Sequence, residues 1–310
     1  MKRFKNILAV VDPAEDHDEA LERAARLALD NGARLHAIAC LDDSLPRGES
    51  DVIRQAIIAG MTDRLATIAA PVRERGVEVD IRIAFGEPFI EIIRRVMRGR
   101  HDLLVKVANR VDLESPLSFG STDLHLIRKC PCPVWMINTG RTTSGQGGVL
   151  ACVDVLSEDD RDNEVSITIM ELATSLATRS GSSCHVVHAW SSPLEQLWAD
   201  SPWLQLDPQE LDDLVVLAEE RHTAGFHKLV DGFRPLVEDF GVHLRKGDPA
   251  TVIVDIAREL EAEVIVLSTI GRSGIAGLFI GNTAESVLAR VDCSVLAIKP
   301  KGFISPVSVE

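Results

Sequence analysis

The sequence contains no apolar stretch near the roughly 18–20 residues that a helix needs to cross a bilayer, and no run of basic residues. The apolar run at residues 7–11 follows basic residues, as in a signal peptide, but it meets Asp12 and Pro13 without a small-residue cleavage site. The net charge of −14 disfavours direct binding to nucleic acid or to an anionic membrane. We therefore expect a cytoplasmic protein with neither kind of partner.

The six cysteines include no C-x-x-C pair, and the one close pair is Cys130 and Cys132 with Pro131 between them. Two prolines stiffen this segment and no second pair matches it, so metal or redox work by the pair is disfavoured. The other cysteines lie in or beside apolar runs, where a small buried residue is the default interpretation. They are Cys40, Cys152, Cys184 and Cys293. Free thiols are expected in a reducing compartment.

Patterns typical of catalysis are also missing: the sequence has no Ser–His–Asp spacing, no paired carboxylates and no zinc signature. His185 and His188 lie three apart in a strand-like run, so they face opposite sides and do not easily share one metal. This combination favours a protein that binds a ligand or partner without converting it.

Short apolar runs alternate with amphipathic helical segments along the whole chain. The expected strands include residues 7–11, 35–40, 77–83, 103–105, 149–153, 184–189 and 264–267, and the expected helices include residues 15–30, 52–75, 163–180 and 209–240. Such alternation predicts an α/β fold with a parallel sheet covered by helices on both faces.

The second half of the chain repeats the first. Gly247-Asp248-Pro249 corresponds to Gly86-Glu87-Pro88, and Gly281-Asn282-Thr283 corresponds to Gly120-Ser121-Thr122 with the same difference in residue number, which we call the repeat offset. The sequence therefore predicts two tandem Rossmann-like domains, each a doubly wound five-stranded parallel sheet. We place the first domain at residues 1–139, a flexible linker at 140–148, the second domain at 149–302 and a tail at 303–310. Ligands of such sheets bind at the carboxyl ends of the strands.

The later half carries a glycine-rich loop between an apolar strand and a helix that starts near residue 282. Gly271, Gly274 and Gly281 let the backbone approach an anion, and the free N–H groups of the helix point at it. Asn282 or Thr283 is the expected N-cap. The alternative is that the glycines only let the loop pass tightly over the sheet edge.

Together these motifs resemble the universal stress protein (UspA) superfamily, and the tandem arrangement resembles its bacterial E-type branch. The resemblance rests on a strand ending in Asp, the Gly-Glu-Pro or Gly-Asp-Pro before a helix, the buried strand, and the loop ahead of the last helix. It covers residues 3–138 and 148–300, and includes the segment 122–131 in the first half and 271–285 in the second.

The resemblance implies a pseudo-dimer in which the two domains associate through their last strands, near residues 134–137 and 295–298. It also implies an ATP site in members with the loop G-x2-G-x9-G-[ST], which holds the phosphates, while the carboxylate after the first strand faces the ribose. Gly271, Gly274 and Gly281 match the glycines and Asp154 matches the carboxylate. Arg272 is a candidate phosphate partner.

The sequence departs from that pattern in both halves. Six residues rather than nine separate Gly274 from Gly281, and Asn282 replaces the expected hydroxyl residue, with Thr283 one place on. In the first half the segment 109–112 replaces the glycines, and Asp112 and Glu114 add negative charge that repels phosphate. ATP with Mg²⁺ is therefore a candidate ligand of the second domain alone.

The leading hypothesis is a non-catalytic stress-response protein that binds a ligand or partner. One alternative is an ATP-binding switch or slow ATPase that uses the second-domain loop. Another is a carrier of an apolar small molecule, suggested by an apolar cluster. Such a cluster can instead form a homodimer face, and more often it covers the end of a sheet. The cluster contains Trp190, Leu194, Leu197, Trp198, Trp203 and Leu204.

Overall fold

The computed structural model describes residues 4–41, 50–109, 119–139, 147–155, 160–201, 207–269 and 280–309. These residues form two compact units. The first unit contains the described residues up to 139, together with residues 280 and 292–309, and the second contains residues 147–269 and 281–291. Within the described ranges, no helix has both the length and the apolar character that crossing a membrane requires.

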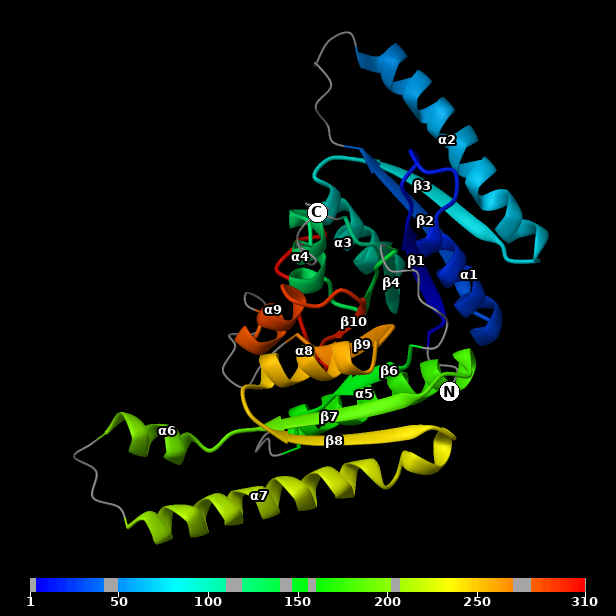
Figure 1. The fold of residues 1–310 in the computed structure, drawn as a ribbon. Helices are drawn as coiled ribbons and strands as arrows, with labels where there is room; N and C mark the ends of the chain where they lie inside the picture. The colour runs from blue at the N-terminus through cyan, green and yellow to red at the C-terminus, as the bar shows by residue number, and fades with distance from the viewer. Residues whose placement is uncertain are drawn as a thin grey trace. The chain divides into compact units, whose positions relative to one another are not determined.

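The first unit is a twisted sheet with helices against it (Figure 1). Its elements are β1 (Asn6–Val10), α1 (Glu19–Asn31), β2 (Arg34–Leu41), α2 (Ser50–Glu74), β3 (Val79–Phe85), α3 (Pro88–Gly99), β4 (Leu103–Val107), α4 (Ser121–Lys129), β5 (Val134–Ile137) and β10 (Ser294–Ile298). The strand order is β3-β2-β1-β4-β5-β10. Strands β1 to β5 are mutually parallel, and β10 is antiparallel to β5.

The second unit repeats this plan with four parallel strands in the order β9-β6-β7-β8. Its elements are β6 (Val149–Cys152), α5 (Asp160–Ser180), β7 (Cys184–Trp190), α6 (Pro193–Asp200), α7 (Pro208–Val230), the 3₁₀ helix η1 (Arg234–Leu236), β8 (Phe240–Lys246), α8 (Pro249–Glu259), β9 (Val264–Ser268) and α9 (Asn282–Leu288). The alternation of strands and helices confirms the predicted α/β class with two Rossmann-like repeats.

The backbone carries the same repeat that the sequence shows. Gly86 and Gly247 have φ angles of 137° and 153°, values that side-chain-bearing residues rarely adopt. Arg100 and Glu261, which are related by the same repeat offset, are the non-glycine residues with positive φ in the described ranges, at 51° and 48°. The duplication therefore extends to individual strained backbone positions.

The last strand of the second repeat lies in the sheet of the first unit. β10 pairs with β5 through Val295 with Met136, Leu296 with Trp135 and Ala297 with Val134. This confirms the pairing of residues 134–137 with 295–298 that the family resemblance implied.

The residues after β10 also pack on the first unit. Arg94 Nε donates to the Ser308 carbonyl at 3.2 Å, and an Arg98 guanidinium nitrogen donates to the Val309 carbonyl at 2.7 Å. The described C-terminal residues are thus tied to α3 of the first unit.

The predicted helix over residues 209–240 is wrong at its carboxyl end. α7 ends at Val230, and β8 begins at Phe240 after a short 3₁₀ helix. Gly232 favours other conformations and Pro235 lacks the N–H that a continuing helix needs, so the chain turns back here. The residues of β8 are partly exposed, as expected for a strand at a sheet edge.

Candidate ligand site at the strand ends of the second unit

Asp154 lies two residues after the end of β6 at Cys152, and Ser166 of α5 holds its backbone in place. The buried Ser166 hydroxyl donates to the Asp154 carbonyl at 2.7 Å and accepts from the Asp154 N–H at 3.3 Å. The Asp154 residue itself is partly exposed. Its backbone is therefore fixed at the carboxyl end of the strand, the end at which parallel sheets bind ligands.

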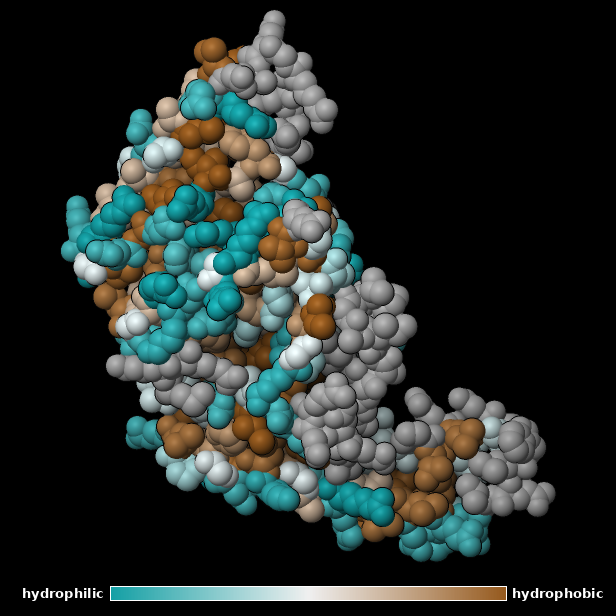
Figure 2. Space-filling view, turned by 180° about the vertical axis from the view of Figure 1, so that it is seen from behind, coloured by the Kyte–Doolittle hydropathy of each residue, from teal (hydrophilic) through white to brown (hydrophobic). Residues whose placement is uncertain are grey.

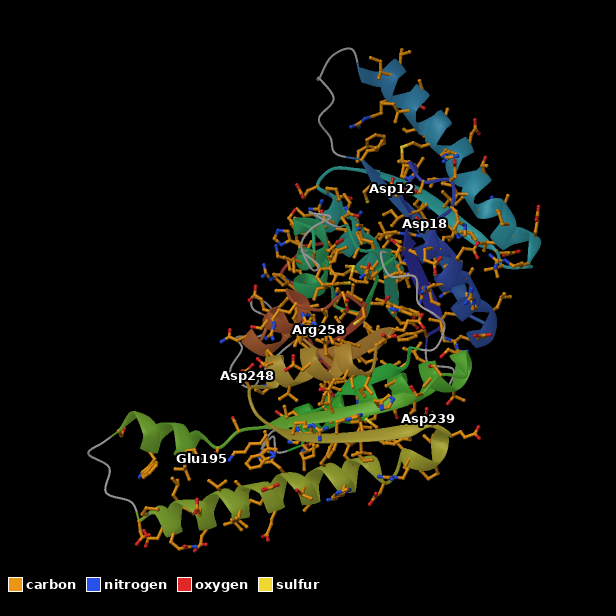
Figure 3. All side chains as sticks on the ribbon, in the orientation of Figure 1. Asp12, Asp18, Glu195, Asp239, Asp248 and Arg258 are labelled. Carbon is orange, nitrogen blue, oxygen red and sulfur yellow. The ribbon has the colours of Figure 1, made fainter. Side chains whose placement is uncertain are left out.

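Asp12 corresponds to Asp154 in the first unit, and its carboxylate takes part in a turn. Asp12 Oδ1 accepts from the Ala14 N–H at 2.9 Å, and the Asp12 N–H donates to Asp18 Oδ2 at 3.1 Å. Asp18 also caps α1 through its Oδ1, which accepts from the Leu21 N–H at 2.7 Å, and burial raises its pKa. Figure 3 labels both aspartates. Asp12 is thus a turn carboxylate, the structural role that such a position often has.

The helix after β9 starts at Asn282, as predicted, but its N-cap is the preceding residue. Gly281 is the N-cap of α9, with extended backbone angles, and its N–H donates to the Thr269 carbonyl at 2.9 Å. The prediction of Asn282 or Thr283 as N-cap is wrong, because both already belong to the helix, where neither residue is buried. Gly271, Arg272 and Gly274 lie outside the described residues.

Two of the predicted elements share one edge of the sheet. β6 and β9 are parallel neighbours, with Val149 opposite Val264 and Ala151 opposite Val266. Asp154 and Thr269, which follow these two strands, therefore lie beyond the carboxyl ends of neighbouring strands.

In the first unit, β4 and α4 correspond to β9 and α9, and a buried ion pair joins them. Lys106 on β4 and Asp123 in the first turn of α4 approach to 2.8 Å, with side-chain exposures of 9% and 0%. Asp123 Oδ2 also accepts from the Asn109 N–H at 2.7 Å, and Lys106 Nζ donates to Asn109 Oδ1 at 3.0 Å. A carboxylate of the chain itself therefore neutralises the amino end of α4.

The second unit has apolar residues at both positions. Leu267 and Ala284 correspond to Lys106 and Asp123 by the repeat offset, and both are buried. Sequence reasoning missed the ion pair, although a lysine inside the apolar run 103–107 signals a buried partner. The repulsion expected from Asp112 and Glu114 falls outside the described residues.

A histidine pair lies beside the strand end of β6. His188 Nδ1 is 3.1 Å from the Val153 carbonyl, and His188 Nε2 is 2.8 Å from His222 Nδ1 on α7. The Trp190 ring stacks on His222 with 5.4 Å between ring centroids. Sequence reasoning missed His222, because nothing local shows which face of the long helix α7 contacts β7.

Comparison with known proteins agrees with this architecture. The model of the universal stress protein family matches the chain twice, over residues 3–138 and 149–299. The chain belongs to the universal stress protein family. It is similar to Universal stress protein E of Escherichia coli (strain K12), with 32% identity over all of this chain and 98% of the relative. The same protein of Salmonella typhi is 31% identical over all of this chain and 99% of the relative.

Solved structures share the tandem fold of this universal stress protein. A crystal structure of a universal stress protein from Pseudomonas aeruginosa UCBPP-PA14 superimposes with a TM-score of 0.74 and 25% identity, and covers 97% of this chain and 95% of that one. A universal stress protein from Archaeoglobus fulgidus DSM 4304 gives a TM-score of 0.61 at 17% identity. These relatives assign the chain to the stress-response proteins of this family.

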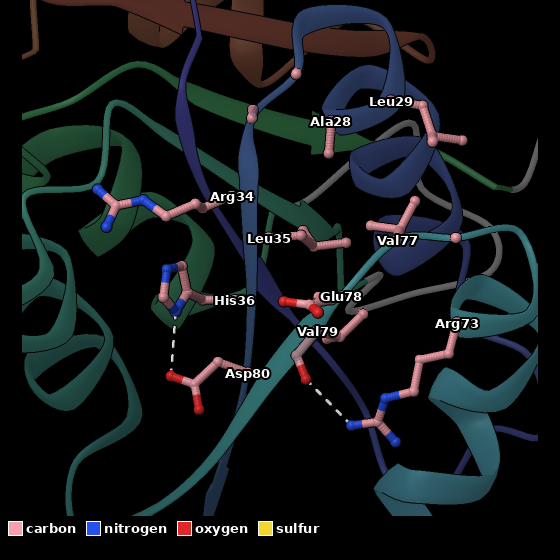
Figure 4. A pocket seen from close by; sticks show the side chains of 13 residues that line it. Ala28, Leu29, Arg34, Leu35, His36, Arg73, Val77, Glu78, Val79 and Asp80 are labelled. Carbon is pink, nitrogen blue, oxygen red and sulfur yellow. Dashed lines mark hydrogen bonds and ion pairs between the residues drawn. The ribbon is translucent and has the colours of Figure 1, made fainter.

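A separate cavity of about 920 Å³ in this universal stress protein lies in the first unit (Figure 4). It is lined by the end of α1, the end of α2 and the starts of β2 and β3, so it opens at the amino ends of the strands. His36 and Asp80, paired at 3.2 Å, form part of its wall. It is therefore distinct from the carboxyl edge, where ligands of doubly wound sheets bind.

One close pair of thiols and a further pair of histidines occur among the described residues. Cys130 Sγ and Cys132 Sγ are 3.6 Å apart as free thiols. His185 Nδ1 lies 3.1 Å from His243 Nε2, and burial lowers the pKa of both rings. His185 and His188 thus have different partners, as their opposite faces predicted. No group of three or more metal-ligating side chains occurs in the part of the chain that the structure describes.

Proposed function

We propose that this universal stress protein acts in the cytoplasmic stress response by binding a ligand or partner without converting it. We place its ligand at the strand ends of the second unit. The observation that carries the proposal is the difference between the repeats: Lys106 and Asp123 fill this place in the first unit, whereas Leu267 and Ala284 stand there in the second. A buried carboxylate in the first turn of α4 repels a phosphate, and the second unit has no such group at that position.

The ligand class that fits best is a nucleoside triphosphate with Mg²⁺. Asp154 would face the ribose, as the family resemblance implies, from a backbone that Ser166 holds rigidly. Gly271, Arg272, Gly274, Gly281, Asn282 and Thr283 would then meet the phosphates. The cytoplasmic location is supported by six free cysteines, which suit a reducing compartment.

Calorimetric titration of the full chain with ATP and Mg²⁺ tests this proposal. We expect one saturable site that Asp154→Asn weakens by about tenfold, equivalent to about 1.4 kcal/mol, and that Gly274→Asp abolishes. Asp12→Asn is the matched control, because it changes the corresponding carboxylate of the first unit and should leave ATP binding unchanged. Saturable binding that survives Gly274→Asp contradicts the proposed site.

A hydrolysis assay separates a passive binder from a switch or slow ATPase. Release of phosphate from ATP at a rate that Gly274→Asp eliminates would convert the proposal into the enzymatic alternative. Binding without such release supports the non-catalytic function.

A second candidate function rests on the exposed apolar side chains of α6 and α7. They gather at the end of the second unit formed by these helices (Figure 2), and include Leu194, Leu197, Trp198, Leu214, Val216 and Leu217. Trp190 of the predicted cluster is buried instead, and Trp203 and Leu204 lie outside the described residues.

Such a surface suits a carrier of an apolar or amphipathic small molecule. Native mass spectrometry of the freshly purified chain tests it, with a homodimer as the competing result. A co-purifying small molecule that Trp198→Glu removes supports the carrier, whereas a dimer that the same change dissociates shows a subunit interface.

A further inference from the structure

His185 and His243 bring two ring nitrogens together on neighbouring strands of the second unit. His185 lies on β7 and His243 on the edge strand β8, and the distance from Nδ1 to Nε2 is 3.1 Å. Both residues are partly exposed, and their ring centroids are 5.2 Å apart at an interplanar angle of 43°. In the described residues, each ring makes its hydrogen bond with the other.

A glycine leaves the space that this arrangement requires. Gly241 lies opposite His185 in the strand register, two residues before His243. A Cβ atom at position 241 would collide with His185 Nδ1, far inside van der Waals contact. The His185 ring therefore rests directly against the Gly241 backbone, and any side chain there would displace it.

The first unit uses the same strand positions differently. His36 occupies the place of His185 in the strand register, but its Nδ1 lies 3.2 Å from a carboxylate oxygen of Asp80, which also binds Arg95 at 3.2 Å. In the second unit, Gly241 and Ile256 stand at the positions that correspond to Asp80 and Arg95 by the repeat offset. The first unit thus has an ion-pair network at these positions. The second unit has two imidazoles instead, with no arginine at the corresponding helix position.

We propose that His185 and His243 form a two-histidine binding site for a divalent transition-metal cation of the zinc type. Imidazole nitrogens are preferred ligands of Zn²⁺, Cu²⁺ and Ni²⁺. Two nitrogens bound tetrahedrally at about 2.0–2.1 Å from zinc stand about 3.3 Å apart, close to the 3.1 Å found between these rings. Water would complete the coordination, since the site is partly open to solvent.

The protonation chemistry of this site balances without an added base. One ring now donates its N–H to the other, so metal binding requires that ring to carry its proton on its other nitrogen. No net proton is released. The negative charges of Asp239 on His185 and of Glu259 on His243 favour a cation, against the opposing charge of Arg245. Figure 3 shows Asp239 next to the start of β8.

Titration of the metal-free full chain with Zn²⁺, in competition with a chromophoric chelator, tests the site. We expect one equivalent to bind, and His185→Ala and His243→Ala each to weaken binding by at least about tenfold. His17→Ala, which removes an exposed histidine elsewhere, should leave the affinity unchanged. Gly241→Ala should weaken binding although it removes no ligand.

The second histidine pair supplies the decisive comparison. Zinc binding that His222→Ala abolishes and His243→Ala leaves intact would overturn the proposal, because the metal would then belong to His188 and His222. Equal affinity in all variants would overturn it as well. Circular dichroism checks each fold, and His243→Gln replaces His243→Ala if the alanine variant does not fold.

Discussion

Lys106 Nζ and Asp123 Oδ1 lie 2.8 Å apart inside the first unit, where neither side chain is appreciably exposed to water. Asp123→Ala leaves the Lys106 charge buried without its partner, and we expect a loss of about 3–5 kcal/mol in the free energy of unfolding. Urea denaturation of the full chain measures it.

The double substitution Lys106→Leu with Asp123→Ala reproduces the residues of the second unit, Leu267 and Ala284. We expect it to recover most of the lost stability, because no buried charge then remains unpaired. Additive effects of the two single substitutions would show that the ion pair contributes no coupling energy.

Ser166 binds both backbone polar groups of Asp154, so its hydroxyl supports the end of β6. Ser166→Ala should lower the free energy of unfolding by about 1–2 kcal/mol. Hydrogen exchange of the Asp154 amide should also become faster. Ser180→Ala is the control on the same helix, since that hydroxyl bonds to carbonyls of its own helix and to Ser182.

Stability of the first unit should depend on pH through His101. Burial, followed by the positive charges of His36 and Arg95, lowers the His101 pKa to about 4. In the unfolded chain this histidine binds its proton near pH 6.5. The contribution of neutral His101 to the free energy of unfolding is therefore fully present above that pH. It is lost as the pH falls from about 6.5 towards 4, by on the order of 2 kcal/mol.

Urea unfolding at a series of pH values, with wild type compared with His101→Phe, checks this prediction. The phenylalanine keeps an aromatic ring and removes the titrating group, so the variant should lose less stability on acidification. Identical pH profiles would assign the acid sensitivity to other groups.

The pairing of β10 with β5 predicts which amides lose protection from hydrogen exchange when β10 is disrupted. Ala297→Pro removes a backbone donor in the strand that faces Val134, and we expect about 1–3 kcal/mol of destabilisation. Hydrogen exchange should accelerate first at residues 134–137 in β5. Unchanged protection of β5 would contradict this pairing in solution.

The fold was largely predictable because strand and helix periodicities are local. The apolar run Val264–Ser268 indicates a strand without any knowledge of tertiary contacts. The matched Gly-Glu-Pro and Gly-Asp-Pro motifs likewise indicate helix starts and the duplication. The extension of α7 to residue 240 failed because the strand β8 is only partly buried and lacks a continuous apolar run.

The candidate sites were less predictable because they depend on contacts distant in sequence. His222 meets His188 from 34 residues away, and His243 meets His185 from 58 residues away, through helix packing and strand register. The N-cap of α9 was misplaced for a different reason: Gly281 takes that position through its backbone alone. The place of Asp154 near the end of β6 was predictable because a polar residue after an apolar run marks a strand end. Its role toward a ligand stays a prediction.

The assignment of β10 to the sheet of the first unit has a consequence for biosynthesis. The ribosome makes β5 long before it makes the antiparallel neighbour of that strand, residues 294–298. During translation the nascent first half must therefore wait with β5 lacking this neighbour while almost the whole second repeat is added. Strand β5 can gain this neighbour only after residues 294–298 have left the ribosome.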